Sequence, residues 1–197
     1  MNFDDFKALV GLSFRDPQAA AHLLMGQDWP VSARWMALLA AVSVSALLAS
    51  FAAVLFSTPG PDGTQVVMLS RQPMVLAMMQ LVAIVLAAGL MSGVGRMFGG
   101  QGRFEDALLL TVWIEVLLLL VQAAQLALSL ILPAVAGLVG LAAIVLFLWL
   151  TVQFTKALHG FRSSAKVALG LVGTAFVAGF VLSLIAAALG ILPEMPQ

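Results

Sequence analysis

Apolar residues are arranged along this chain in long runs that charged side chains rarely interrupt. A membrane whose hydrocarbon core is about 30 Å thick needs about 20 apolar residues of helix to cross it. The longest run, from Ala107 to Thr155, is too long for one crossing, and we expect it to fold back at Pro133. Proline cannot donate the hydrogen bond of a continuing helix but suits the first turn of a new one. The pattern therefore predicts five membrane spans at residues 35–56, 73–94, 107–130, 134–156 and 167–192.

The segment before the first span has a different, amphipathic pattern. At about 100° per residue, one face of a short helix collects apolar side chains that can anchor it at the membrane surface: Phe3, Phe6, Val10 and Phe14. A second short helix is expected next, with Asp16 as its N-cap, Pro17 in its first turn and Gly26 at its end. We interpret residues 1–33 as a cytoplasmic interfacial segment and residues 34–197 as the membrane domain. The alternative for the segment is a docking element for a partner.

The composition agrees with a membrane protein and excludes several other classes. Apolar residues make up 62% of the chain and charged residues 9%, with a mean hydropathy of +1.11, whereas soluble domains average roughly 25% charged residues. The formal net charge of zero provides no basic surface of the kind that nucleic acids need. The absence of cysteine excludes disulfides and thiolate chemistry. We predict an all-α, polytopic membrane helix bundle in contact with the lipid bilayer.

The positions of lysine and arginine predict the orientation of the spans. Cytoplasmic loops of membrane proteins carry an excess of these residues. Of the nine in this chain, only Arg71 is predicted on the side opposite the N-terminus; the others are Lys7, Arg15, Arg34, Arg96, Arg103, Lys156, Arg162 and Lys166. We therefore expect a cytoplasmic N-terminus and an external C-terminus. In a bacterium, the protein would lie in the inner membrane with its C-terminus in the periplasm.

The third predicted span carries a polar stripe along one face. Its residues fall within about 80° on a helical wheel: Thr111, Glu115, Gln122, Gln125 and Ser129. Polar groups cannot face lipid without losing hydrogen bonds, so we expect the stripe to face the bundle, a partner subunit or a water-filled cavity. Its expected neighbours are Gln80 on the second span and Thr151 and Gln153 on the fourth.

Glu115 is the only charged residue predicted to lie deep inside a span, and it has two interpretations. Intramembrane carboxylates often serve as proton or cation sites, which would make the protein a small transporter. The structural interpretation is a protonated or hydrogen-bonded glutamate that holds helices together. We favour the structural one, because no second ionisable residue in the predicted membrane core could relay a proton.

No pattern in the sequence predicts catalysis or a bound cofactor. Both histidines, His22 and His159, are expected at the cytoplasmic surface, which leaves no histidine in the membrane core to bind a haem iron. Without cysteine or an HExxH helix, we expect no metal site. The chain also has no GxSxG nucleophile motif. We therefore predict a protein that is not an enzyme and needs no cofactor.

Small residues recur at four-residue spacing in the last two spans, a pattern that lets helix backbones approach closely in lipid. One row is Ala136 and Gly140 in the fourth span; the rows in the fifth are Gly170, Thr174 and Ala178, and Ala175, Gly179, Ser183 and Ala187. We expect these rows to pack spans of one chain together, and the alternative is contact between chains.

A glycine-rich loop joins the second and third spans. Its Gly-Gly-x-Gly-x-Phe sequence is formed by Gly99, Gly100, Gly102, Arg103 and Phe104. It is not a GxxxxGK[ST] phosphate loop, and we interpret it as a flexible turn. This loop, the small-residue end of the second span and residues 159–166 before the last span resemble the bacterial branch of the Yip family, membrane proteins named for interacting with Ypt/Rab GTPases. The likeness covers most of residues 1–192.

The resemblance implies five spans, a cytoplasmic N-terminus and action through partner proteins. In eukaryotes the family is associated with Golgi and endoplasmic reticulum traffic and with membrane shaping. The family often has a proline partway along the third span, where this chain has Trp113 and Glu115. We expect an organiser or accessory subunit that contacts a membrane-protein partner, or a second copy, through the polar stripe and the glycine loop. The alternative is a small transporter or lipid-handling protein that uses the stripe.

Overall fold

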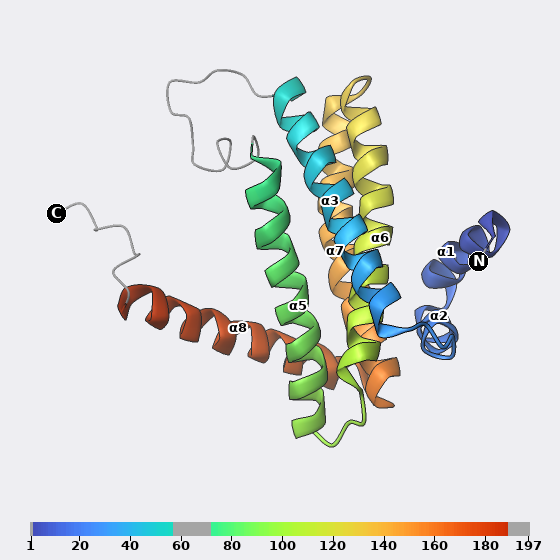
Figure 1. Cartoon of the computed structure of the whole chain (residues 1–197), viewed down its shortest axis with the longest axis vertical. Coiled ribbons are helices and arrows are strands. Elements are labelled where there is room, and N and C mark those ends of the chain that lie inside the picture. The colour runs from blue at the N-terminus through green and yellow to red at the C-terminus, as the bar shows by residue number, and fades with distance from the viewer. Residues whose placement is uncertain (1, 57–71, 189–197) are drawn as a thin grey trace.

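The computed structural model describes residues 2–56 and 72–188, and within these ranges the chain forms helices and no strands. Figure 1 shows the helices in order along the chain: α1 (Phe3–Arg15), α2 (Pro17–Met25), α3 (Val31–Phe56), α5 (Pro73–Met97), α6 (Phe104–Ser129), α7 (Pro133–His159) and α8 (Ser164–Ala188). The all-α prediction is therefore confirmed for the described part of the chain.

All five predicted spans are confirmed as helices that are long and apolar enough to cross a membrane: α3, α5, α6, α7 and α8. The predicted end of the fifth span, residues 189–192, lies outside the described residues. The predicted break is also confirmed, since α7 begins at Pro133. Several helices extend a turn beyond the apolar run. The first turn of α6 includes Glu105 and Asp106, and the last turn of α7 includes Lys156 and His159. These charges suit the helix dipole at those ends.

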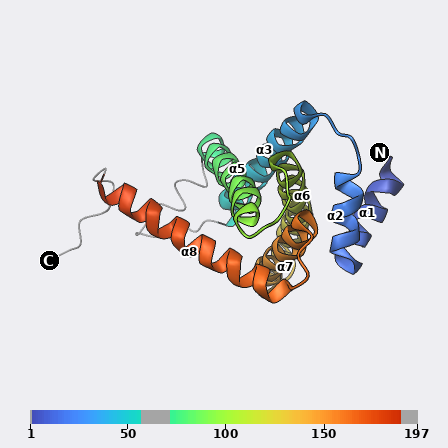
Figure 2. The ribbon, with the colours of Figure 1, turned by 90° about the horizontal axis from the view of Figure 1, so that it is seen from below.

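Four of the spans form an elongated bundle with α6 at its centre. The helices α3, α5 and α7 all pack against α6, and Figures 1 and 2 show them running side by side. The largest fully buried apolar side chains lie at these contacts: Leu38, Leu108, Leu110, Leu117, Leu150 and Phe154. Among the described spans, α6 therefore has the largest share of buried residues.

The two N-terminal helices lie against the side of this bundle, as Figure 2 shows from below. The predicted ends of α2 are confirmed. The Asp16 carboxylate accepts the backbone N–H of Ala19 at 3.0 Å and caps α2, and Gly26 follows its last turn. α2 packs on α6 and α7, and α1 packs on α2. The segment before the first span is therefore part of the packed structure.

The last helix, α8, diverges from the bundle. It contacts α5 and α7 near its start, then runs sideways from the foot of the bundle (Figures 1 and 2). Among its described side chains only Val167 is buried, while Phe176 is 77% exposed. α8 has the length and hydropathy of a span, but it does not pack along the other four.

Candidate functional site

The polar stripe of α6 faces two neighbouring helices at the level of Glu115. The side-chain amide of Gln80 on α5 donates to Glu115 Oε1 at 2.6 Å and lies 3.2 Å from Ser45 Oγ on α3. The Ser45 hydroxyl in turn donates to Gln122 Oε1 at 3.1 Å. The chain Glu115–Gln80–Ser45–Gln122 therefore joins three helices through side-chain hydrogen bonds, and the predicted contact with Gln80 is confirmed.

The other stripe residues make separate contacts. Thr111 donates to the carbonyl oxygen of Leu108 in its own helix at 2.9 Å, and Ser129 donates to that of Gln125 at 2.8 Å. Gln125 faces α7, because a Cβ atom added to Gly140 would lie 2.8 Å from its amide nitrogen. The stripe is thus divided between contacts to α3 and α5 and a contact to α7.

The other two expected neighbours of the stripe do not bond to it in the described structure. Gln153 accepts a hydrogen bond from Gln18 on α2 at 2.9 Å, and Thr151 donates to the carbonyl oxygen of Phe147 in its own helix at 2.7 Å. The expectation was wrong because Gln153 lies on the face of α7 that α2 covers. The expectation did not include the N-terminal helices as packing partners of the bundle.

The glycine loop encloses His159, a residue that the sequence predicts at the cytoplasmic boundary of the membrane but does not predict to be buried in the protein. This side chain, at the end of α7, is 7% exposed. A Cβ atom added to Gly95, Gly100 or Gly102 would overlap its imidazole ring or lie against it. The ring also stacks on Phe161, with centroids 5.2 Å apart. The glycines therefore make room for a buried aromatic ring, which no local sequence pattern reveals.

Two hydrogen bonds fix the His159 ring in this loop. Its Nδ1 accepts the backbone N–H of Gly102 at 3.0 Å, and its Nε2 lies 2.9 Å from the carbonyl oxygen of Met91. This pairing suits the neutral ring with its proton on Nε2. The loop is consequently tied to α5 and α7, and its interpretation as a flexible turn is wrong. Within the loop, Gly99 adopts the left-handed conformation that glycine allows, with φ at 84°.

The remaining residues of the glycine loop lie at its exit into α6. Arg103 and Glu105 form an exposed ion pair at 3.0 Å, a pair that contributes little in water. Phe104 is half-buried and packs against the core. A second ion pair, between Arg34 and Asp106 at 3.0 Å, is much more enclosed, and Arg34 also donates to the carbonyl oxygen of Trp29. It joins the start of α3 to the first turn of α6.

Part of the predicted interfacial anchor on α1 packs against α6 instead of facing outward. Phe6 meets Trp113 of α6 edge to face at 5.7 Å between ring centroids, and the Trp113 indole N–H donates to Ser13 Oγ at 2.8 Å. Val10 is half-buried, while Phe3 and Phe14 stay exposed. Sequence reasoning missed this contact. The available signal was a tryptophan inside a span, because its N–H needs a partner when buried.

The small-residue rows of α7 and α8 behave differently. On α7, Ala136 is buried and Gly140 lies against Gln125 of α6, so this row packs within the chain as expected. On α8, Ala175, Gly179 and Ser183 are exposed, and no atom lies within 4 Å of a Cβ atom added to Gly179. The expectation of packing within one chain is therefore wrong for the described part of this row.

These observations define the class of protein first: a polytopic, all-helical integral membrane protein with apolar helices long enough to cross the bilayer. The family follows from comparison with known families. The model of the Yip1 domain matches residues 11–185, which is most of the chain, so the chain belongs to the Yip1 domain family. The resemblance to the Yip family seen in the sequence is thereby confirmed. No curated protein and no solved structure gives a significant match.

Proposed function

We propose that this protein is a non-enzymatic membrane organiser or accessory subunit that works through helix contacts with a partner membrane protein or a second copy of itself. The observation that carries the proposal is the exposed row Ala175, Gly179 and Ser183 on α8. In lipid, small residues at four-residue spacing let another helix approach closely. The row has no packing partner among the described residues of the chain itself.

The direction of α8 supports the same proposal. A span that packs along its bundle covers its small residues, as α7 does with Gly140. α8 instead leaves the bundle after contacts with α5 and α7 (Figure 1), and large apolar side chains remain exposed along it. A helix from another chain could pack on the exposed length of α8 around Gly179 without displacing a contact that α8 makes with α5 and α7.

In this proposal, the polar stripe and the glycine loop act by setting the shape of the contact surface. The hydrogen bonds of Glu115, Gln80 and Ser45 join α3, α5 and α6. The loop around His159 joins the ends of α5 and α7, from which α8 departs. We further propose that the N-terminus and this loop are cytoplasmic, which the distribution of lysine and arginine supports.

Site-directed crosslinking tests the proposed contact. The chain has no cysteine, so Gly179→Cys provides a unique thiol for a photo-crosslinker in native membranes. We expect a discrete adduct, identified by mass spectrometry as a second copy or one membrane protein. The matched control is Gly173→Cys, which is also exposed on α8 but lies outside the row. Equal adducts from both positions, or none from Gly179→Cys, would contradict the proposal.

A further inference from the structure

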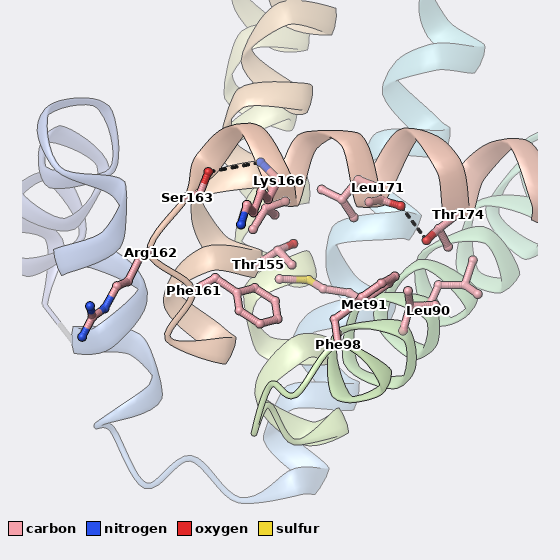
Figure 3. A pocket seen from close by; sticks show the side chains of 14 residues that line it. Leu90, Met91, Phe98, Thr155, Phe161, Arg162, Ser163, Lys166, Leu171 and Thr174 are labelled. Atoms are coloured by element: carbon pink, nitrogen blue, oxygen red, sulfur yellow. Dashed lines mark hydrogen bonds between the residues drawn. The ribbon is translucent and has the colours of Figure 1, made fainter.

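A cavity lies at the start of α8, between that helix, the end of α5 and the loop after α7. Its volume is about 360 Å³, within the range of roughly 300–1,000 Å³ that is typical of ligand sites. Figure 3 shows Phe161 and Met91 on its floor and Leu171 on the opposite wall. Neither the polar stripe nor the exposed row at Gly179 contributes to its lining.

The walls of this cavity are mainly apolar, and its outer edge is cationic. Leu90, Val94 and Phe98 of α5 and Val167 of α8 add further apolar surface. Lys166 and Arg162 lie at the edge near Ser163, while Thr155 is a buried part of the lining. In Figure 3 the Lys166 side chain reaches down beside Thr155, while Arg162 points outward. The cavity therefore has an apolar interior and positive charge on one side.

The charge at the edge has no counter-ion within the described part of the chain. The ion pairs among the described residues join Arg34 to Asp106 and Arg103 to Glu105, and neither involves Lys166 or Arg162. Both cationic side chains are exposed. An anionic group could therefore approach them without breaking an ion pair of the described structure.

We propose that this cavity binds an anionic phospholipid, with one acyl chain between α5 and α8 and the phosphate beside Lys166. Both helices are long and apolar enough to lie in the bilayer, so phospholipid is the molecule that surrounds the opening of the cavity. Basic residues at the membrane boundary attract anionic headgroups. A wholly apolar ligand would not use Lys166, and a small soluble anion would not fill the apolar interior.

Gly170 provides a direct way to fill the cavity. It lines the cavity, and no atom lies within 4 Å of a Cβ atom added there. Gly170→Leu should therefore occupy the acyl-chain position without distorting the helix, in which leucine is favoured over glycine. Gly173→Leu is the matched control, because Gly173 also has open space around it but does not line the cavity.

The experiment is native mass spectrometry of the full chain, released from nanodiscs of phosphatidylcholine with or without phosphatidylglycerol of the same acyl chains. We expect selective retention of phosphatidylglycerol. Lys166→Gln should weaken that retention about fivefold, the effect of one basic residue near the surface, while Lys7→Gln on α1 should not. Gly170→Leu should reduce retention strongly, and Gly173→Leu should not.

Several outcomes would overturn the proposal. Equal retention of the two phospholipids would show that the cationic edge does not select the headgroup. Equal behaviour of Gly170→Leu and Gly173→Leu would show that the cavity is not the binding place. Displacement of the lipid by inorganic phosphate at low concentration would assign the site to a free anion. Lipid binding and the crosslinking at Gly179 use different residues, so either proposal can fail while the other stands.

Discussion

At the scale of single residues, we propose that Glu115 contributes a hydrogen bond that needs an acceptor oxygen rather than a charge. Gln80 donates to its carboxylate at 2.6 Å, and the carbonyl oxygen of a glutamine can accept the same bond. We predict that Glu115→Gln changes the free energy of unfolding by less than about 0.6 kcal/mol, whereas Glu115→Leu lowers it by up to about 1.7 kcal/mol. Circular dichroism during unfolding in mild detergent measures both values.

The same pair of variants separates the two interpretations of Glu115. If Glu115→Gln destabilises the protein as much as Glu115→Leu, the charge itself matters. Loss of proton-coupled solute uptake in a stably folded Glu115→Gln variant would favour the transporter. Retention of stability and of partner association is the result expected from a structural hydrogen bond.

Gly100 is predicted to be intolerant of even one added methyl group. A Cβ atom there would overlap the buried ring of His159, and overpacking of this kind costs about 1–3 kcal/mol. Gly100→Ala should therefore lower the unfolding temperature, while Gly93→Ala on α5, where a Cβ atom meets no neighbour, should not. His159→Ala removes the obstacle, so adding Gly100→Ala to it should cost much less than in the wild-type background. Additive losses in this double-mutant cycle would disprove the proposed contact.

At the scale of elements, α1 and α2 stabilise the bundle by covering α6 and α7. Ser13 accepts the indole N–H of Trp113, and Gln18 bonds to Gln153. We predict that Ser13→Ala, which leaves a buried N–H without its acceptor, costs about 1–3 kcal/mol. His22→Ala is a surface comparison within the same segment, because the His22 side chain is exposed, and thermal unfolding in detergent measures both variants. An unchanged stability of Ser13→Ala would mean that α1 is only loosely associated with the bundle.

α8 differs from the other spans at this scale because its apolar surface extends all the way round. It has no polar stripe to select a face, and Lys166 is its one charged residue. Its position is fixed only near its start, by α5 and α7. The helix can therefore present small residues at Gly179 to another chain while the bundle stays closed around α6.

At the scale of the whole molecule, the sequence predicted what local physics determines. Span lengths, the break at Pro133 and the cap at Asp16 follow from hydropathy and from proline and N-cap chemistry, and the structure confirms them. Local physics does not determine the burial of His159 beside Gly102 or the hydrogen bond from Gln18 to Gln153. Both are contacts between residues far apart in the chain. The direction of α8 depends on tertiary packing, and a uniformly apolar helix carries no periodic signal for it.

The central claim is that α8 joins this protein to another membrane-embedded chain. The most direct test extracts the full-length protein from native membranes in mild detergent, sizes it on a native gel and identifies its companions by mass spectrometry. We predict a stoichiometric complex with one membrane protein or a second copy, lost in Gly179→Leu and kept in Gly173→Leu. Recovery of the wild-type protein alone as a monomer, or a complex that Gly179→Leu leaves intact, would contradict the account.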